Sequence, residues 1–528
     1  MAFPLLLLAL GSRFIETAPR TSRLYCRARV SHLLAPEALS ELLEWLGDAQ
    51  QFSHLLPSTS SRQHIMRDFQ RELPLPFFAS QRLVLADGRV VLDLLVSKDS
   101  ASLACGPWLP EQLDGCRITR RHDIKAPRIA ILGSGLAGCN LAHALASRGA
   151  RVSVFERSAL AHTGASGNRQ GALYIKPALA WSRENRLHVL SYQFAHRFYQ
   201  RQFGRESHSE AGPRPPWQHC GVLHLAQNER ERARMSQLHQ QAVYPERFIR
   251  SLSFRDAARL AGADLDCPAA AMPQGGTLEP AKLCEHLLAA HDIQVLTHQS
   301  VQTGDWDAVV WAGGHPQAGD ELAPTHLPLR PIRGQISSVC IAADNTLSMA
   351  QMPNQVLSGD GYVMPPLLNT DSTVWLTFGA SYAVNRSDRG ISEEEMSDNS
   401  RQLARTLPEL AAQLDSTGIS REERAAIRCA STDYMPVVGN ARIPHGRNSA
   451  SQNHSLAETL CQEGRLWYMT AFGSKGLALA PLLAEQLACA ILAEPTPLEP
   501  DLAEGIDPDR WARRAALKGY SPSTGGTG

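Results

Sequence analysis

The stretch PRIAILGSGLAGCNLAHALASRGARVSVFER, residues 127–157, reads as a strand, a glycine-rich turn, a helix and a second strand. The helix is expected over residues 136–148, with small residues facing the sheet. Gly133 permits the tight turn, Gly135 lets the backbone approach a pyrophosphate, and Gly138 lets helix and strand pack closely. The spacing therefore predicts a βαβ dinucleotide-binding unit. A turn-and-packing motif without a ligand is the alternative.

The segment after the second strand indicates which dinucleotide the loop holds. Glu156 ends that strand, where its carboxylate can accept both ribose hydroxyls of an adenosine and disfavours a 2′-phosphate. A Gly/Ser/Asn-rich stretch, RSALAHTGASGNRQGALY (157–174), follows at once in place of the regular βα units of an NAD domain. Small residues and backbone donors suit a cofactor that extends along a ribityl chain, which favours FAD. Cofactor contacts are expected from Ser166, Asn168, Arg169 and Gln170.

A second glycine loop lies near the C-terminus, in AFGSKGLALAP (471–481). The pattern is a strand end, a loop and a helix start, so its N–H groups and positive helix end can stabilise negative charge near flavin N1/O2. Lys475 could add a full positive charge there. An ordinary helix start is the alternative for this motif taken alone. The contacts expected from it are Gly473, Ser474, Lys475, Gly476 and Leu477.

Composition narrows the classes of function. The 528 residues include 52 Lys+Arg and 52 Asp+Glu, so no global basic field points to nucleic acid, although a local patch would not appear in the sum. None of the 11 cysteines forms a CxxC pair or lies near spaced histidines, which predicts no metal site and a reduced, cytoplasmic protein. The apolar run at the N-terminus is too short to span a bilayer, and no other segment reaches that length.

The residues in front of the glycine loop carry weaker signals. Residues 35–46 predict a short amphipathic helix. Residues 81–96 predict a β-hairpin with its turn around Asp87-Gly88, and residues 97–126 an irregular linker.

The remainder of the chain mixes helices and strands. Helices are expected near 184–205 and 281–290, and a strand at 307–313 is expected to pass back under the cofactor. The middle third is rich in strand patterns, which begin near residues 221, 334, 361 and 374. The tail, residues 519–528, is low-complexity and is predicted to be disordered.

Five segments together resemble one known family. They are GASGNRQGALY (164–174), CGVLHL (220–225), YPERF to AMPQGG (244–276), IRCASTDYMPVVGN (427–440) and AFGSKGL (471–477). The chain resembles FAD enzymes of the amino-acid-oxidase type, with glycine oxidase and sarcosine oxidase. More narrowly, it is similar to the oxidoreductase half of the MnmC family of bifunctional proteins for tRNA 5-methylaminomethyl-2-thiouridine biosynthesis.

The resemblance runs over residues 127–518 and implies an α/β (α+β) fold. It implies a Rossmann-like FAD-binding domain, made of segments 127–180 and 424–495. The substrate domain would be an antiparallel sheet of the amino-acid-oxidase type, mainly from segments 215–275 and 325–420.

Only one segment of the N-terminal part resembles the family's other half, which is a methyltransferase. LPLPFFASQRLVLADGRVVLDLLVSKD (73–99) is similar to the middle of the family's methyltransferase half, but no glycine-rich S-adenosylmethionine loop precedes it. Residues 1–126 are therefore predicted to be a truncated methyltransferase remnant plus linker that does not bind S-adenosylmethionine.

The resemblance implies a function in tRNA modification. The family's flavin half oxidises a carboxymethylaminomethyl group on the wobble uridine, releases the carboxymethyl arm and leaves an aminomethyl group, which is oxidation of a CH–NH bond. Its methyltransferase half then methylates that amine. The expected partner is tRNA, with no membrane and no metal. Two alternatives stay open, a small-molecule amine oxidase of the glycine or sarcosine type and a non-enzymatic protein, either an inactive flavoprotein or a tRNA-binding module.

The chemistry needs few protein groups, because the flavin accepts the hydride. Arg428 is the candidate for binding the substrate carboxylate, since a guanidinium matches it with two prongs and the position corresponds to the carboxylate-binding arginine of the resembling oxidases. A structural arginine is the alternative. Tyr382 and Tyr362 are candidate second contacts, with core packing as the alternative for each, and Arg333 in PIRGQ is interpreted as structural. Catalytic candidates are thus Arg428, Tyr382 and Lys475.

Two helices carry basic residues that suit RNA phosphates or a solvated face equally well. One is the segment 507–519, with Arg510, Arg513, Arg514 and Lys518. The other is the end of the helix at 184–205, with Arg197, Arg201 and Arg205 at every fourth position.

Overall fold

A computed structural model describes most of the chain. The described residues are 23–30, 68, 81–85, 87–96, 110–119, 126–158, 164–204, 215–241, 243–301, 304, 306–341, 352–369, 373–416, 419–442 and 455–517. The helix predicted at 35–46 and the tail 519–528 lie outside these residues. The chain divides into two compact units, one made of Met1–Ala126, Ser147–Ala150 and Ala488–Glu499, and the other of Pro127–Ala146, Arg151–Leu487 and Pro500–Gly528.

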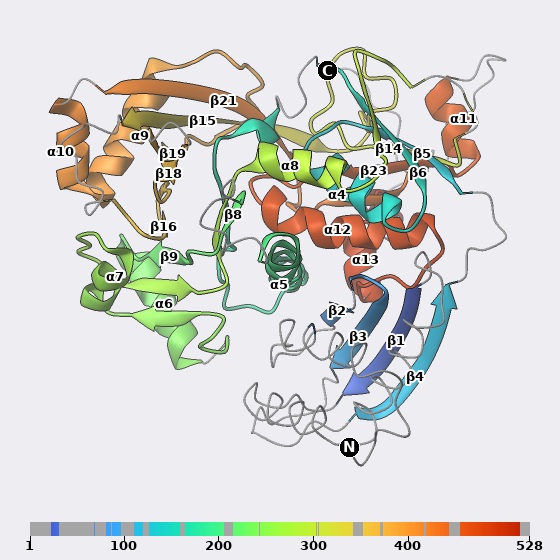
Figure 1. The fold of residues 1–528 in the computed structure, drawn as a ribbon, viewed down its shortest axis with the longest axis horizontal. Helices are drawn as coiled ribbons and strands as arrows, with labels where there is room; N and C mark the ends of the chain where they lie inside the picture. The colour runs from blue at the N-terminus through green and yellow to red at the C-terminus, as the bar shows by residue number, and fades with distance from the viewer. Residues whose placement is uncertain are drawn as a thin grey trace. The chain divides into compact units, whose positions relative to one another are not determined.

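The larger unit contains a six-stranded sheet ordered β13-β6-β5-β14-β23-β22. Its strands are β5 (Arg128–Leu132), β6 (Arg151–Glu156), β13 (Gln294–Thr297), β14 (Ala308–Trp311), β22 (Val437–Asn440) and β23 (Leu466–Thr470). Segments far apart in the sequence thus lie side by side (Figure 1), and all pairs are parallel except β22 with β23. This confirms the predicted βαβ unit. The predicted strand at 307–313 is β14, which lies parallel to β5 and next to it.

Helices complete this Rossmann-like layer. Among them are α4 (Leu136–Ala146), α8 (Pro280–Ala289), α11 (Leu456–Gln462) and α12 (Gly476–Ile491). α4 packs on α8 and on β6, and it ends two residues before the predicted end. Val309, Trp311 and Tyr468 belong to the buried core of this layer, which fixes the carboxyl ends of its strands.

A second, ten-stranded sheet fills the middle of the sequence. Eight strands lie in the order β10-β11-β9-β16-β17-β19-β15-β20, with β18 paired to β19 and β21 to β15. The strands are β9 (Val222–Leu225), β10 (Arg250–Leu252), β11 (Ala269–Met272), β15 (Leu329–Ile341), β16 (Val356–Ser358), β17 (Tyr362–Val363), β18 (Leu367–Leu368), β19 (Val374–Gly379), β20 (Ala383–Val384) and β21 (Ser420–Ser431). It is antiparallel apart from β9 with β16, so the predicted pairing of a Rossmann-like layer with an antiparallel sheet is confirmed.

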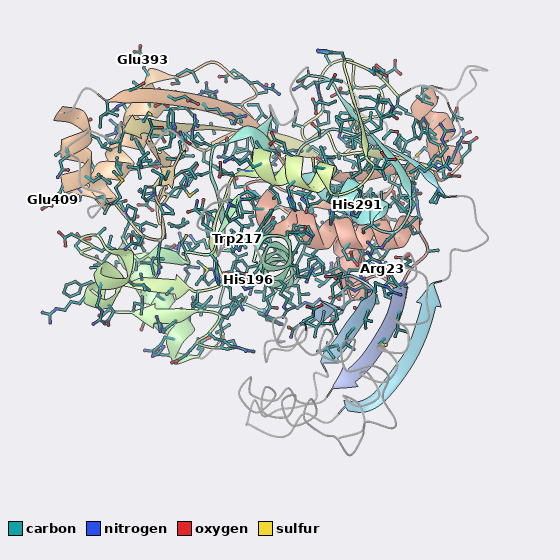
Figure 2. The ribbon with its side chains drawn as sticks, viewed as in Figure 1. Arg23, His196, Trp217, His291, Glu393 and Glu409 are labelled. Atoms are coloured by element: carbon teal, nitrogen blue, oxygen red, sulfur yellow. The ribbon has the colours of Figure 1, made fainter. Side chains whose placement is uncertain are left out.

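Four helices lie with this sheet: α6 (Glu229–Gln240), α7 (Phe254–Ala261), α9 (Glu393–Thr406) and α10 (Pro408–Ser416). α9 packs against β15 and β19, and Leu403 joins Leu376 and Phe378 in a buried cluster. The acidic side chains Glu393 and Glu409 mark the starts of α9 and α10 (Figure 2).

The long strand β15 is flanked on both edges near its start. Ile332 pairs with Val384 of β20 and with Arg428 of β21. Both partners are antiparallel to β15, so this register brings residues from three distant parts of the sequence next to one another.

A small sheet, ordered β7-β12-β8, lies beside α5 (Arg183–Phe203). Its strands are β7 (Gly171–Leu173), β8 (Trp217–Gln218) and β12 (Gly276–Leu278), and a short 3-10 turn, η2 (Ala165–Gly167), precedes β7. His196 of α5 meets Trp217 with ring centroids 6.4 Å apart (Figure 2). Two more helices, α13 (Pro500–Ile506) and α14 (Arg510–Leu517), complete this unit.

The smaller unit contains a four-stranded sheet ordered β2-β3-β1-β4. Its strands are β1 (Arg23–Val30), β2 (Gln81–Leu85), β3 (Val90–Val96) and β4 (Pro110–Thr119). The predicted hairpin is β2 and β3, and its turn has positive φ at Asp87 and Gly88, as a two-residue hairpin turn requires.

Two strands of this sheet were not predicted. β1 lies in a stretch without a clear period, and the prediction of residues 97–126 as an irregular linker was wrong where β4 pairs antiparallel with β1. Pro110 begins β4, and two register shifts interrupt its pairing. Such an irregular edge strand lacks the regular alternation by which a sequence reveals a strand.

Buried charges hold this unit together internally. Arg148 pairs with Glu494 at 2.7 Å, and the Tyr25 hydroxyl donates to the same carboxylate at 2.6 Å. Arg23, at the start of β1 (Figure 2), donates to the Ser147 hydroxyl at 3.0 Å. Loss of either partner of the Arg148–Glu494 pair would leave a buried charge uncompensated, which costs about 3–5 kcal/mol.

Candidate functional site

One cavity of about 1010 Å³ lies in the larger unit, at the carboxyl ends of the parallel strands. Its lining combines the β5–α4 loop, the end of β6 and segments from the antiparallel sheet. The predicted residues among its lining are Gly133, Gly135, Glu156, Ser166, Asn168, Gln170, Gly473, Ser474, Gly476, Leu477, Tyr362, Tyr382 and Arg428.

Two glycines of the first glycine loop lie where a side chain has no room. Gly133 has φ of 109°, and a Cβ there would lie 2.8 Å from the carbonyl oxygen of Ala312. A Cβ at Gly138 would overlap the carbonyl oxygen of Gly133. Gly138 does not line the cavity, so its role is the close packing of α4 on the loop. The loop thereby leaves its backbone exposed to a pyrophosphate.

Glu156 is held as a carboxylate at one wall of the cavity. Ser134 donates to its Oε2 from both the backbone N–H, at 3.0 Å, and the hydroxyl, at 2.7 Å. The Ser158 N–H donates to Oε1 at 3.1 Å. Burial alone would raise the pKa of Glu156, but these hydrogen bonds and the nearby Arg157 outweigh it, and the net shift is downward. An ionised acceptor therefore faces the place where an adenosine ribose would lie.

The Gly/Ser/Asn-rich segment supports the glycine loop. The Ser166 hydroxyl accepts the N–H of Leu136 at 2.9 Å, and a Cβ at Gly135 would lie 3.0 Å from it. Gln170 is buried and donates to the Pro365 carbonyl at 3.0 Å, while its Oε1 is buried without a hydrogen-bond partner in the described residues. An orphaned acceptor in the cavity wall fits a cofactor that carries N–H or O–H donors.

The second glycine loop closes the opposite wall. Gly473 has φ of 56°, and its N–H donates to the Cys429 carbonyl at 2.7 Å. Gly476 and Leu477 begin α12 and line the cavity. The first N–H groups of a helix have no partner within the helix, so this end can stabilise negative charge.

Two predicted cofactor residues face elsewhere. Lys475 does not line the cavity; its ammonium lies 3.5 Å from His188 Nε2 and 3.9 Å from Glu184 Oε1, both on α5. Arg169 lies outside the lining too, with its guanidinium 3.7 Å from the Trp375 ring centroid. The ammonium expected at the flavin end thus lies beside α5, where Glu184 is near it, and the role predicted for Lys475 stays a prediction.

The charge of Lys475 also affects the protonation of His188 on α5. Burial, followed by the Lys475 charge, lowers the pKa of His188 to about 3, so this histidine is neutral at physiological pH. Burial lowers the pKa of Lys475 itself, and Lys176 adds to this, while Glu184 acts in the opposite direction.

Arg428 lies where a carboxylate-binding group is needed. Its guanidinium covers Gly334 of β15, because a Cβ at Gly334 would overlap the guanidinium. Nη1 is buried and has no hydrogen-bond partner in the described residues. Since a guanidinium does not deprotonate in proteins, an unpaired buried N–H of this group requires an anionic or polar partner.

Tyrosines surround this arginine. Tyr174 and Tyr362 line the cavity, and burial raises the pKa of Tyr362 to about 12, with Arg428 opposing and Tyr174 reinforcing the shift. Tyr382 also lines the cavity but is 55% exposed, so it lies at the rim. Both phenols stay protonated at physiological pH and can donate or accept a hydrogen bond.

The two basic helices were predicted to offer either phosphate contacts or a solvated face, and their arginines lie in different surroundings. Arg197 is buried, and burial lowers its pKa to about 10, so it is not a phosphate-contacting surface residue. Arg510 is buried and pairs with Asp433 at 2.9 Å, while Arg514 pairs with the same carboxylate at 2.7 Å. Arg513 pairs with Asp507 at 3.2 Å. Local acids thus compensate these charges, and Arg205 and Lys518 lie outside the described residues.

Several lining residues were missed by sequence reasoning. The loop over residues 312–322 lines the cavity after β14, and its signal was the glycine pair Gly313-Gly314 at a strand end. Arg424 donates to Asn168 Oδ1 from β21, and Arg389 lines the rim. Neither arginine lies in a local motif; Arg424 is outside the cavity lining and contacts the lining residue Asn168, whereas Arg389 lies in the loop after β20.

In the described ranges, no group of three or more histidine, cysteine or acidic side chains could hold a metal ion. No disulfide joins the cysteines within the same residues. None of the described helices is long and apolar enough to cross a bilayer.

A Rossmann-like layer with two glycine loops, an ionised acid after its second strand and an adjoining antiparallel sheet defines a dinucleotide-dependent oxidoreductase of the flavin type. Residues 128–490 match the DAO family, described as FAD dependent oxidoreductase, and the chain belongs to this family. FAD is its cofactor, and the glycine loops, Glu156 and Gln170 described above fit that molecule.

Curated relatives are similar over most of the chain. A "tRNA 5-methylaminomethyl-2-thiouridine biosynthesis bifunctional protein MnmC" from Hahella chejuensis is 34% identical over 404 residues, 72% of this chain and 59% of the relative. Its namesake from Stutzerimonas stutzeri is 32% identical over 461 residues, 82% of this chain and 65% of the relative. The predicted resemblance is thereby confirmed. The matches span only 56–60% of the length of three such relatives.

Solved structures share the fold at low identity. Glycine oxidase from Geobacillus kaustophilus is 18% identical with a TM-score of 0.52, covering 73% of this chain and 99% of that one. Iminodiacetate oxidase from Chelativorans sp. BNC1 is 20% identical with a TM-score of 0.53, covering 72% of this chain and 99% of that one.

Proposed function

We propose that this chain oxidises the CH–NH bond of a carboxymethylaminomethyl group on the wobble uridine of tRNA and leaves an aminomethyl group. The observation that carries the proposal is Arg428, whose buried Nη1 has no hydrogen-bond partner among the described residues at the wall of an FAD cavity. An N-substituted glycine carries its carboxylate one carbon from the nitrogen, so a guanidinium that binds the carboxylate also fixes the CH–NH bond.

The reaction requires positioning more than acid–base chemistry. FAD supplies the two-electron acceptor when bound. The substrate loses a hydride and a proton across the N–CH₂ bond of the carboxymethyl arm, and water then cleaves the resulting imine into the primary amine and glyoxylate. Arg428 binds the carboxylate, and protonated Tyr362 is placed to donate a hydrogen bond beside it. Glu156 anchors the adenosine end of the cofactor.

The tRNA substrate is supported by the relatives rather than by the cavity. The matched relatives are named for tRNA 5-methylaminomethyl-2-thiouridine biosynthesis, and the quoted motifs fall in the shared part. A carboxylate-binding cavity alone would serve a small N-substituted glycine equally well. A tRNA substrate also implies a cytoplasmic site of action.

We further propose that residues 1–126 are a remnant of the relatives' methyltransferase half. The Stutzerimonas stutzeri match covers 82% of the chain, more than residues 127–528 alone can supply, so it extends into this part. The small sheet β2-β3-β1-β4 is what the described residues of this part form. The purified chain should not transfer methyl groups from S-adenosylmethionine to aminomethylated tRNA, and formation of methylaminomethyl-uridine would contradict this proposal.

Nucleoside analysis of carboxymethylaminomethylated tRNA, before and after incubation with the flavin-loaded protein, tests the main proposal. We expect conversion to the aminomethyl nucleoside with equimolar glyoxylate. Arg428→Ala should lower kcat/KM by about 10²- to 10⁴-fold, because two charge-assisted hydrogen bonds are lost, and should keep FAD bound. Arg259→Ala, an exposed arginine on α7, is the matched control. Rapid oxidation of glycine or sarcosine with untouched tRNA would identify a small-molecule oxidase instead.

A further inference from the structure

Exposed apolar side chains are concentrated in the segment that contributes Tyr382 to the cavity lining. Eight large apolar side chains are exposed in the described part of the chain, and three of them, Tyr382, Val384 and Ile391, belong to the single segment 382–391. Tyr434, in the turn after β21, is 54% exposed. Soluble proteins rarely concentrate such side chains without a partner, so the rim is a candidate interaction surface.

The two exposed tyrosines are neighbours. Tyr382 directly precedes β20, and Tyr434 follows β21, the two strands that flank β15. Burial raises the pKa of Tyr382, Tyr434 adds to this rise and Arg428 opposes it, so the two phenols and the guanidinium interact. The two rings therefore lie beside the place where the reacting group must enter.

Buried side chains hold this rim in place. Arg333 is fully buried, pairs with Glu395 at 2.9 Å, and donates to the backbone carbonyls of Asp388 at 3.0 Å and Gly390 at 2.7 Å. Arg333 thus fastens segment 382–391 from beneath, in agreement with its predicted structural role.

The turn that carries Tyr434 is fastened in a similar way. Ser431 donates to the Met435 carbonyl at 2.6 Å, and Asp433 pairs with buried Arg510. Tyr434 itself has φ of 58°, which is uncommon for a bulky residue. Both aromatic rings are therefore displayed to solvent by supported backbone, which lowers the entropy cost of binding a partner.

One cation at the rim has no acid to compensate it. Arg389 is exposed, lines the cavity and forms no ion pair or hydrogen bond within the described residues. Burial lowers the pKa of Arg424, the charge of Arg389 lowers it further and Glu422 opposes the shift, so Arg389 adds positive charge to this region. The arginines of α14 differ, because Asp433 and Asp507 compensate them.

We propose that Tyr382, Tyr434 and Arg389 form a docking surface for single-stranded RNA, which stacks an unpaired base beside the reacting uridine and holds a neighbouring phosphate. Unpaired loop bases are bound in proteins by stacking on aromatic rings and by arginine contacts to phosphates. The surface is continuous with the cavity that must receive the uridine. This proposal rests on the proposed function and names the groups that would select RNA over a small amine.

The test measures binding of a fluorescent, unmodified anticodon stem-loop RNA to the flavin-loaded protein. Tyr434→Ala and Tyr434→Asn should raise Kd by about 5- to 100-fold, and Tyr434→Phe should stay within about twofold, because stacking needs the ring and not the hydroxyl. Asparagine tolerates positive φ, so it removes the ring without adding strain. Phe254→Ala, an aromatic residue that is 48% exposed on α7, is the matched control and should bind as wild type.

Arg389→Ala should weaken binding and reduce the slope of log Kd against log salt by about one, with Arg259→Ala as its control. Bound flavin and Tm must match wild type in every variant. If all rim variants bind RNA as wild type does, the docking surface is wrong even when the wild type converts modified tRNA, and the rim would then suit a protein partner. If the wild type binds RNA through the rim but leaves modified tRNA unchanged, the proposed reaction fails and the docking surface stands. Absence of RNA binding by the wild type would overturn both.

Discussion

The two ends of the cavity are built in different ways. At the dinucleotide end, Gly133, Gly138 and Glu156 come from one continuous strand–helix–strand stretch, and each contact lies within that stretch or beside it. At the carboxylate end, Arg428 lies over Gly334 because β21 pairs with β15, although the two residues are far apart in the sequence. The first end depends on local backbone geometry, whereas the second depends on the register of a sheet.

The difference extends to hydrogen bonding. Glu156 receives three hydrogen bonds from its own neighbourhood and is satisfied before any ligand arrives. Arg428 keeps a buried N–H that has no partner in the part of the chain that the structure describes. Glu156, whose hydrogen bonds are already made, organises the glycine loop, whereas Arg428 has an N–H left to bind a ligand. Substitutions at the two ends should therefore separate cofactor binding from substrate binding.

The largest effect is expected from Gly138→Ala. The new Cβ would overlap the carbonyl oxygen of Gly133, so helix α4 must move off the loop, at a cost of about 3 kcal/mol or more. Purified protein should have lost its flavin absorbance and much of its thermal stability. Gly390→Ala is the control, because a Cβ there meets nothing within 4 Å and Gly390 does not line the cavity. Full flavin content in the Gly138 variant would refute the role of this contact.

Gly334→Ala should affect only the carboxylate end. The added methyl group displaces the Arg428 guanidinium, so kcat/KM for the carboxymethylated substrate should fall by about 10- to 100-fold, mainly through KM. Flavin content should stay at the wild-type level. Normal kinetics would show that Arg428 does not need the glycine beneath it, and loss of flavin would show that the two ends are coupled.

Glu156→Gln should weaken FAD binding by about tenfold and change its pH dependence, since a charge-assisted contact to the ribose becomes a neutral one. The pKa of Glu156 in the folded protein lies below its ordinary value of 4.5, so its stabilising contribution is present above that pH and is lost as pH falls through the lowered value. Thermal melts of both proteins between neutral and acidic pH check this. The variant should lose less stability on acidification than the wild type; equal losses would contradict the assignment.

The smallest effect is expected from Lys475→Met. The ammonium lies beside Glu184 and His188 on α5 and not in the lining of the cavity, so the rate of flavin reduction should change by less than about threefold. The pKa of His188 should rise, because the neighbouring positive charge is removed. A loss of 100-fold or more in the rate of flavin reduction, measured by stopped flow, would show that Lys475 does act on the flavin.

The sequence by itself determined the Rossmann-like layer, the FAD loops and the hairpin β2–β3, because each is encoded by residues close together in the chain. Gly133, Gly138 and Asp87-Gly88 are required by local backbone geometry, which leaves a readable pattern. Arg428 was predicted through a resemblance between motifs, but its contact with Gly334 was not predicted. Strand β4 was missed, since an irregular edge strand carries no regular alternation, and β1, which lies between β3 and β4, was missed with it.

Only the tertiary structure decided which charges are available to a ligand. The sequence does not distinguish Lys475, Arg197 and Arg510, which all appear as basic residues available to a ligand. In the structure, Lys475 lies beside Glu184 of α5, Arg197 is buried in the core, and Arg510 pairs with Asp433. Arg389 carries no motif, but it lies at the rim and no acid among the described residues pairs with it. The physical reason is that the energy of a charge depends on its surroundings within a few ångströms, and those surroundings come from strands and helices that only folding brings together.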